Sequence, residues 1–459
     1  MADGQTPVDA ALDALAQDLH PNQIALPGSA DYAETVAIDN GRIAYHPAAV
    51  IYPETAADVQ RVLAVCRQYG VHFTLRNGGH NAVGWCLNDG GIVVHLKRLR
   101  QLALDAEART LMVGSGLLWG DVYGALRDSG LVPIGGGSTA VGVSGFTLGG
   151  GFSFLSRSHG LAVDNLLAVE FVTADGELLT LGPDETDPDR AALFWALRGG
   201  GGGNLGVATA FTSNVFPAVP DALGGVLVWD IADAARVLHA YRSWVLDMPD
   251  TLDAAIVLSP TQLILLAYCH SPHTEGLAVM QPMIALAPKI NRLAPTGFYD
   301  FIDTYGSSTT SAGKSTYIAF GNVAEPPDDA FFDTLVEHIA TAPSTATQIA
   351  LEYAGGAIAR VPPTATAFPW RHVCARCEIK ATWDSQKDDA TNIAWAERLK
   401  AALGDALSGG DVNQQDPLLT DWPAAYYGDN YPRLQRVKAR WDPDNVFRFP
   451  QSIRLPDAD

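Results

Sequence analysis

The chain has 459 residues, of which 47% are hydrophobic and 18% are charged. This length and composition predict about two to three globular domains with a large buried core, and they exclude a disordered protein. Lys and Arg number 30 against 51 Asp and Glu, which gives a formal net charge of -21. That charge disfavours nucleic acid and anionic membrane surfaces as partners.

The start of the chain and its cysteines indicate a cytoplasmic protein. Residues 1–19 read as a short amphipathic helix and lack the basic and apolar regions of a signal peptide. No apolar run reaches the ~18 residues that a membrane-spanning helix needs. The five cysteines are an odd number and few for this length, which favours reduced, mostly buried thiols.

The first part of the chain, residues 40–217, alternates short β-type runs with helical patterns. Apolar residues recur at helical spacing over 56–69, with Thr55 as the expected N-cap, Asp58 completing a capping box and Gly70 ending the helix. Further along the chain, the patterns predict strands and one helix. The strands are expected at 71–75, 92–96 and 111–115, and the helix at 117–129.

The second part, residues 218–410, carries longer β-type runs interleaved with helices. Strands are predicted at 224–229, 256–259, 263–269 and 374–383, and helices at 328–341 and 388–403. Prolines at 217 and 220 indicate a boundary between the two parts. The tail, residues 421–453, returns to a helical pattern.

Three glycine clusters lie in the first part, at residues 76–81, 135–151 and 198–206. Adjacent glycines let backbone N–H groups approach an anionic ligand closely. Each cluster has a simpler alternative: a turn with positive φ, a surface loop or a flexible linker. Apolar neighbours argue for burial, so the three clusters together predict an extended dinucleotide cofactor.

A nicotinamide-binding Rossmann site is the weaker alternative for this cofactor. Gly201, Gly203 and Gly206 satisfy the GxGxxG pattern. In a Rossmann fold this pattern opens a helix after a strand. Here a β-type run, residues 207–211, follows it instead, and no Walker A pattern occurs in the chain.

Ordered motifs along nearly the whole chain resemble the berberine-bridge-enzyme-like branch of FAD-linked oxidases, which have the vanillyl-alcohol-oxidase type of fold. The matching segments are RNGGH at 76–80, STAVG at 138–142 with GGG at 149–151, SR at 156–157 with GLAVDN at 160–165, FWALRGGGGGN at 194–204, GGA at 355–357, TAFP at 366–369, YYGDNY at 426–431 and WDPDNVF at 441–447.

The resemblance implies an α+β protein with two domains. A bipartite FAD-binding domain of the PCMH type would comprise residues 1–217 and 415–459. A substrate domain, residues 218–414, would be an antiparallel sheet covered by helices, with its open face over the flavin ring. The implied activity is oxidation of a small alcohol, amine or phenolic molecule by FAD, with O2 reduced to H2O2. A dehydrogenase with another acceptor, and a flavin-binding protein without turnover, remain alternatives.

The resemblance also implies the residues around the flavin. They are Arg76, Asn77, Gly78, Gly79, His80, Asn81, Ser138, Thr139, Val141, Gly142, Gly145, Val207, Tyr427 and Asn430. His80 matches the histidine that is bonded to the flavin 8α-methyl carbon. Ser138 stands where many relatives have a second linking cysteine, so a single link is expected. Val141 matches an oxygen-gate position at which valine accompanies oxidases.

The catalytic base is less clearly marked. Relatives use a tyrosine in a YxNY segment, but the matching residues 411–414 read DVNQ. Asp411 stands at the first tyrosine position, with a solvated loop aspartate as the alternative. Glu378 lies on the strand predicted at 374–383, where alternation places Arg376 and Lys380 on its face, and a solvated charged face is the alternative there. Tyr427 is a third candidate, for which packing is an equal possibility.

Two patterns resemble metal sites. Cys374 and Cys377 have CxxC spacing, but strand alternation would point their thiols to opposite faces. Cys269, His270 and His273 lack a fourth ligand at zinc-site spacing. The sequence therefore predicts no metal site.

Overall fold

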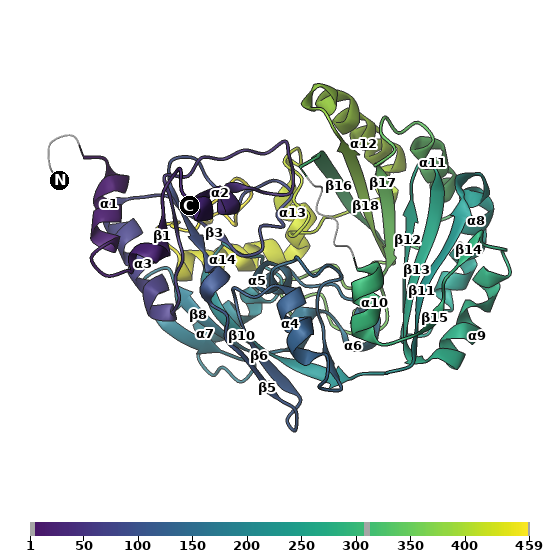
Figure 1. Ribbon diagram of the computed structural model, residues 1–459, viewed down its shortest axis with the longest axis horizontal. Coiled ribbons are helices and arrows are strands. Elements are labelled where there is room, and N and C mark those ends of the chain that lie inside the picture. The colour runs from purple at the N-terminus through teal and green to yellow at the C-terminus, as the bar shows by residue number, and fades with distance from the viewer. Residues whose placement is uncertain (1–4, 307–312, 458–459) are drawn as a thin grey trace.

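The computed structural model describes residues 5–306 and 313–457. Over these residues it contains three β-sheets of four, six and eight strands. The two smaller sheets form one half of the molecule and the eight-stranded sheet forms the other (Figure 1). The helices within the described ranges are too short or too polar to cross a bilayer.

The four-stranded sheet has the order β1-β2-β4-β3. Strands β2, β4 and β3 are parallel, and β1 is antiparallel to β2. Helices α1 and α3 pack on this sheet around a common apolar core. The elements are α1 (Pro7–Leu15), β1 (Ile24–Ala25), α2 (Ala30–Val36), β2 (Ala49–Ile51), α3 (Ala56–Tyr69), β3 (Phe73–Arg76) and β4 (Ile92–His95).

The six-stranded sheet is antiparallel, with the order β5-β6-β10-β8-β9 and β7 paired to β10. Its strands are β5 (Leu102–Asp105), β6 (Thr110–Gly114), β7 (Leu131–Pro133), β8 (Leu166–Thr173), β9 (Leu178–Leu181) and β10 (Gly206–Pro217). The helices that accompany it are α4 (Trp119–Leu126), α5 (Val143–Leu148), α6 (Ser156–His159) and α7 (Pro188–Leu197).

The eight-stranded sheet is also antiparallel, with the order β14-β11-β13-β12-β17-β18-β16 and β15 paired to β11. Its strands are β11 (Ala222–Asp230), β12 (Leu252–Leu258), β13 (Gln262–Pro272), β14 (Ile290–Asn291), β15 (Ala294–Thr296), β16 (Ser315–Val323), β17 (Gln348–Tyr353) and β18 (Ala375–Trp383).

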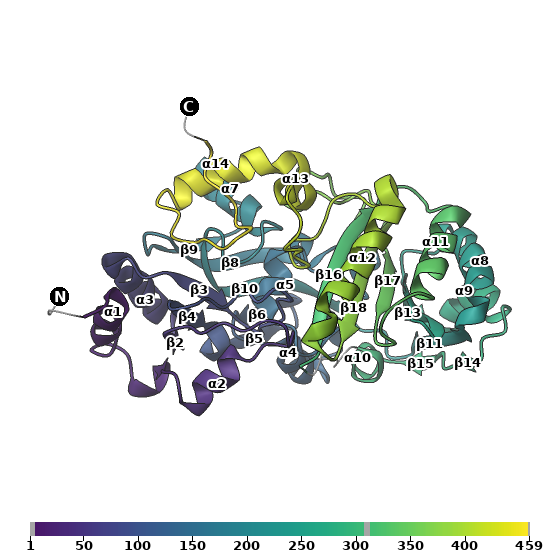
Figure 2. The same ribbon diagram turned by 90° about the horizontal axis from the view of Figure 1, so that it is seen from above.

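One face of this sheet is covered by helices and the other turns toward the smaller sheets. The covering helices are α8 (Ala234–Leu246), α9 (His273–Ile284), α11 (Asp329–Ile339) and α12 (Asp389–Leu403), which share a core with the sheet (Figure 2). Helix α10 (Phe298–Tyr305) instead packs into the core of the six-stranded half. The α+β class predicted from the sequence is confirmed.

The C-terminal helices return to the half that holds the N-terminus. Helix α14 (Tyr431–Trp441) packs on α7, and α13 (Trp422–Tyr427) lies between α14 and the β16 edge of the eight-stranded sheet (Figure 2). The exact domain limits at 217 and 415 stay a prediction.

Local signals placed several elements correctly. Thr55 and Asp58 form the predicted capping box at the start of α3, and Gly70 ends that helix in the left-handed conformation with φ 65°. Strand β10 begins at Gly206, so a strand and not a helix follows the GxGxxG pattern. The Rossmann alternative is therefore wrong.

Candidate functional site

A cavity of about 340 Å³ lies between the two halves of the molecule, and we call it the main cavity. Its walls come from segments that are far apart in the sequence: the loop after β3, the segment around α5, the turn before β10, strand β18, residues 411–415 and residues 447–449. Eight glycines line it, at positions 78, 79, 142, 145, 151, 202, 203 and 206. All three glycine clusters of the sequence therefore meet at one site.

The loop that follows β3, residues 77–81, is fixed from beneath by a buried histidine. The Nε2 atom of His95 lies 3.0 Å from the carbonyl oxygen of Asn77, and its Nδ1 atom lies 3.2 Å from the hydroxyl of Thr35. A carbonyl oxygen only accepts, so Nε2 must carry the proton and Nδ1 must accept. Burial, followed by the charges of Arg76 and Lys97, lowers the pKa of His95 to about 3, which keeps this ring neutral.

Two glycines bring the loop and the segment before α5 into backbone contact. A Cβ atom on Gly142 would lie 2.6 Å from Asn77 Nδ2 and 2.7 Å from the nitrogen of Gly78. Gly78 meets Gly142 equally closely from the other side. Gly145, in contrast, has open space where a side chain would point. The arrangement leaves backbone close to the cavity without side chains in between.

The polar groups of this wall fit an anionic dinucleotide. Arg76 is buried, and its Nε atom has no hydrogen-bond partner among the described residues. The Oδ1 atom of Asn77 is likewise buried and unpartnered there. Both atoms are covered by protein, and the terminal nitrogens of Arg76 donate to the Ala37 carbonyl and toward Cys86 Sγ. Arg76 therefore supports the loop from behind, and the backbone amides of Gly78 and Gly79 are what this wall offers to a ligand. Exposed backbone amides are donors that suit a pyrophosphate.

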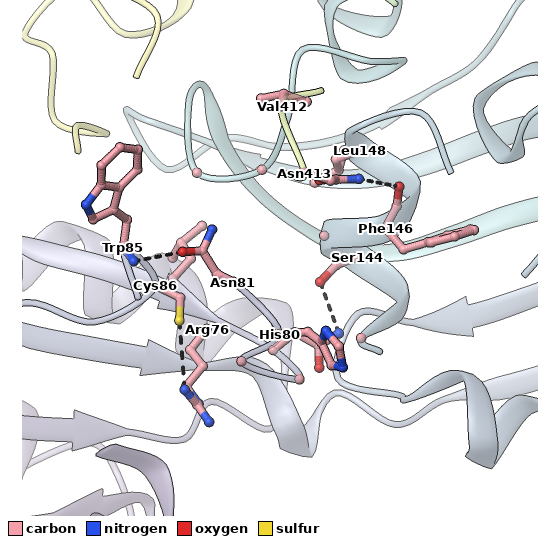
Figure 3. Close-up of a pocket in the computed structure, with 18 of the residues that line it drawn as sticks. Arg76, His80, Asn81, Trp85, Cys86, Ser144, Phe146, Leu148, Val412 and Asn413 are labelled. Atoms are coloured by element: carbon pink, nitrogen blue, oxygen red, sulfur yellow. Dashed lines mark hydrogen bonds between the residues drawn. The ribbon is translucent and has the colours of Figure 1, made fainter. Parts of the chain in front are cut away.

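His80 reaches the cavity from the same loop (Figure 3). Its side chain is exposed and lines the cavity. Burial of the surrounding loop lowers the pKa of His80, the positive charge of Lys380 lowers it further, and Asp39 acts in the opposite direction. An unprotonated imidazole nitrogen has the free lone pair that a covalent bond to a ligand needs.

An ion pair stands on the part of the wall that comes from the eight-stranded sheet. Arg376 Nη2 lies 2.5 Å from Asp411 Oδ2, and Arg376 Nη1 lies 2.5 Å from Glu352 Oε2. The Arg376 guanidinium also stacks 4.0 Å above the ring of Phe152. Asp411 is only 6% exposed, so the alternative of a solvated loop aspartate is wrong.

Glu378 lies two residues beyond Arg376 on the same open face of β18. Its neighbours Cys377 and Ile379 point into the core beneath the covering helices, as strand alternation predicted. Glu378 is half-buried. Burial raises the pKa of Glu378, Lys380 lowers it, and the nearby Glu352 raises it again. The alternative, a solvated charged face, therefore holds only in part, because Glu378 is only partly exposed to solvent.

Most of the predicted cofactor residues line the main cavity, and some do not. Those in the lining are Arg76, Asn77, Gly78, Gly79, His80, Asn81, Val141, Gly142 and Gly145, together with the catalytic candidate Asp411. Those outside it are Ser138, Thr139, Val207, Tyr427 and Asn430, together with Glu378. Val207 is fully buried in the core between β10 and α3.

Tyr427 and Asn430 hold the C-terminal helices in place. The Tyr427 hydroxyl donates to the carbonyl of Gly200 at 3.0 Å, and its ring stacks on Tyr431. The Asn430 amide donates to the carbonyls of Pro363 and Thr366. The side chains of both residues are engaged in packing and hydrogen bonds, which favours the packing alternative for Tyr427.

The sequence analysis missed several residues of the lining, among them Trp85, Ser144, Phe152, Asn413 and Gln415. Phe152, Asn413 and Gln415 adjoin motifs that had been singled out, and this proximity was a usable signal. Trp85 had no local signal, because its position depends on how the loop after His80 folds back over the site.

Two family models match the chain. The model described as "FAD binding domain" matches residues 47–182, and the model described as "Berberine and berberine like" matches residues 412–454. The chain is 30% identical to an FAD-linked oxidoreductase of Bacillus subtilis, YgaK, over 92% of this chain and 94% of the relative. It is also 30% identical to xylooligosaccharide oxidase of Thermothelomyces thermophilus, over 90% and 88% of the two chains.

Among solved structures, Physcomitrella patens BBE-like 1 superposes with a TM-score of 0.88 at 27% identity, over 98% of this chain and 100% of that one. The fold and the cavity thus define an FAD-binding oxidoreductase. The chain belongs to the berberine-bridge-enzyme-like family of FAD-linked oxidoreductases.

Proposed function

We propose that the protein is an oxidase of a small alcohol, amine or phenolic molecule, with FAD linked to it through His80 alone. The observation that supports this most strongly is that one cavity is lined by the His80 loop, by Val141 and by the Arg376–Asp411 pair. When bound, FAD would take a hydride from the substrate carbon at N5 and pass the two electrons to O2, giving H2O2.

The wall with His80 would bind and anchor the cofactor. The lowered pKa of His80 leaves its imidazole nitrogen free to bond to the flavin methyl group. The backbone of Gly78 and Gly79 would receive the pyrophosphate, and Arg76, which donates to the Ala37 carbonyl, would hold this loop from behind. A valine at position 141, half-buried in the lining, supports access of O2, as the family resemblance implies.

Two carboxylates are candidates to take the substrate proton. Asp411 already accepts hydrogen bonds from Arg376 and from the backbone N–H of Asn413, at 2.5 and 2.7 Å. Glu378 lies outside the lining of the main cavity but on the same open face of β18 as Arg376, which lines it. Burial raises the pKa of Glu378, and this is the direction that favours a general base. We therefore assign proton acceptance to Glu378. We assign the orientation of the substrate to Asp411 together with Arg376.

The cofactor link is tested by acid precipitation of the purified protein. Yellow colour is expected to stay in the pellet for wild type and to move to the supernatant for His80→Ala. Colour in the wild-type supernatant would show that FAD is bound without a link. Ser138→Ala should leave the colour in the pellet, because Ser138 makes no second link.

The activity is tested by anaerobic reduction of the flavin with a panel of alcohols, amines and phenols, followed by admission of air. Reoxidation within seconds, with one H2O2 per substrate, is expected of an oxidase, and slow reoxidation would indicate a dehydrogenase. Loss of a general base costs ~10²–10⁴-fold in rate. Glu378→Gln should therefore slow reduction by at least about 100-fold, and Asp411→Asn should act mainly on substrate affinity.

A further inference from the structure

A second cavity, of about 210 Å³, lies beside the main cavity. Its walls come from residues 40–45 and 82–85 of the N-terminal half, from β16 of the eight-stranded sheet and from residues 415–417. Its lining consists of Asn40, Arg42, Ile43, Tyr45, Ala82, Val83, Trp85, Thr316, Tyr317, Ile318, Gln415 and Pro417.

The two cavities are neighbours that share part of their walls. Trp85 and Gln415 line both of them. Asn81 connects the two: its Nδ2 donates to Gln415 Oε1 at 2.7 Å, and its Oδ1 accepts from the backbone N–H of Trp85 at 3.0 Å. Trp85 and His80 lie on opposite sides of Asn81 (Figure 3). The second cavity therefore lies on the far side of Asn81 from His80, beside the place that the proposed flavin link gives to the cofactor.

The main polar groups around the second cavity already have partners within the protein. The Asn40 amide donates to the carbonyls of Ala82 and Thr316, at 2.7 and 2.8 Å, and accepts from the N–H of Thr316 at 2.9 Å. Arg42 pairs with Asp389. The Tyr317 hydroxyl donates toward Glu397 and Asp416. What remains for a ligand is apolar and aromatic surface, chiefly Ile43, Val83, Trp85, Ile318 and Pro417.

Two donors at this surface are free. Among the described residues, neither the hydroxyl of Tyr45 nor the indole N–H of Trp85 has a hydrogen-bond partner. Both side chains are half-buried, and Tyr and Trp place an apolar ring beside a polar atom that can bond to a ligand. Both would be satisfied by an acceptor oxygen on a bound ring.

We propose that the second cavity is a subsite for the non-reacting end of the substrate, and that this end is an aromatic ring that carries an oxygen acceptor. The size agrees, because a dry apolar cavity of about 150 Å³ suffices to bind benzene. The proposal rests on the proposed function in one respect: the reacting carbon of the same molecule lies in the main cavity.

The test measures binding of 4-methylanisole to the flavin-loaded protein by isothermal titration calorimetry, which needs no turnover. Wild type is expected to bind one molecule. Ala82→Leu, which fills the second cavity, should weaken binding at least about tenfold, and Tyr45→Phe should weaken it about threefold to tenfold. Ala330→Leu makes the same change at an exposed position of α11 and should bind like wild type.

The proposal would be overturned if wild type did not bind 4-methylanisole. It would also be overturned if Ala82→Leu and Tyr45→Phe both bound it with the affinity of wild type. Retained flavin absorbance shows that a variant is folded. If Ala82→Leu loses its flavin absorbance, the affinity of Tyr45→Phe alone tests the proposal. The proposed function fails separately, by the absence of flavin reduction with every substrate of the panel. A protein that reduces its flavin with small alcohols but does not bind 4-methylanisole would refute the subsite alone.

Discussion

At the scale of single residues, the site depends on side chains that never touch the cavity surface. His95 belongs to β4, yet it supports the loop that presents His80 by holding the carbonyl of Asn77. The support works because the ring is neutral and its two nitrogens have different partners. A hydrophobic residue of similar size would fill the space and leave these partners unpaired.

His95→Leu is therefore expected to lower the free energy of unfolding by about 1–3 kcal/mol for each buried polar group left unpaired, and to reduce the fraction of covalently held flavin. Denaturant unfolding and the colour of the acid pellet measure the two effects. His95→Gln keeps a donor side chain and should be milder on both counts. Equal flavin content in His95→Leu and wild type would contradict the positioning role.

The same residue predicts a pH dependence. The folded pKa of His95 is about 3 and the ordinary value is 6.5. The unfolded chain therefore binds a proton between these values that the folded chain does not bind. Wild-type stability should fall as the pH drops from 6.5 toward 3, and this slope should be smaller in His95→Gln. Identical slopes in the two proteins would show that His95 does not contribute.

At the scale of elements, the main cavity is shaped where the loop after β3 crosses the start of α5. The contact between Gly78 and Gly142 is made by backbone on both sides. Strand β18 contributes in another way, since alternation sends Cys377 and Ile379 into the core and puts Arg376 and Glu378 on the open face, where Arg376 lines the main cavity. A strand with this pattern supplies a core face and a functional face at once.

Gly142→Ala tests the crossing. Its Cβ would lie within 2.6 Å of Asn77 Nδ2 and 2.7 Å of the Gly78 nitrogen, so the loop must move and FAD content should fall at least about tenfold. Flavin absorbance per protein measures this. Gly124→Ala is the matched control, because Gly124 lies exposed in α4 with nothing within 4 Å of the added carbon. The control should be neutral or stabilised by up to about 1 kcal/mol.

At the scale of the whole molecule, a buried guanidinium helps to join the two halves. Arg157, from α6, is 3% exposed and donates to the carbonyls of Met248, Leu252 and Ala354, all on the side of the eight-stranded sheet. The halves therefore meet through a buried donor that satisfies backbone acceptors.

Arg157→Ala should lower the free energy of unfolding by at least about 3 kcal/mol, because several buried carbonyls lose their donor together. Arg360→Ala provides the comparison, since Arg360 forms a largely exposed pair with Asp250 near the same junction and should cost about 1 kcal/mol or less. Thermal and denaturant unfolding measure both. Similar losses in the two variants would argue against a special role for Arg157.

Asp253, on β12 beside Arg157, gives this junction a pH response. Burial raises the pKa of Asp253 from 3.8 to about 7, against the opposing charge of Arg157. Between these values the folded chain keeps a proton that the unfolded chain releases, so stability should fall as the pH rises from 4 to 7. Asp253→Asn is neutral throughout and should flatten that slope. An unchanged slope would show that Asp253 does not titrate in this range.

Much of the molecule was readable from the sequence for local reasons. A capping box needs only residues 55 and 58, and strand alternation needs only neighbours along β18. The glycine clusters indicate a backbone that can approach a ligand closely. The motifs around His80 and at the C-terminus identified the family, because many short patterns occur in a fixed order. These features depend on residues that are close together in the chain.

The features that the sequence did not predict depend on contacts between segments that are far apart in the chain. The burial of Asp411 is decided by Arg376, which lies 35 residues earlier and meets it only after β18 joins the sheet. Tyr427 looked like a cofactor residue, but the return of α13 onto Gly200 turned its hydroxyl away. The second cavity exists because residues 40–45 and β16 come together across the two halves. A sequence determines local conformation and family directly, whereas burial, pairing and cavities follow from packing that only the folded chain creates.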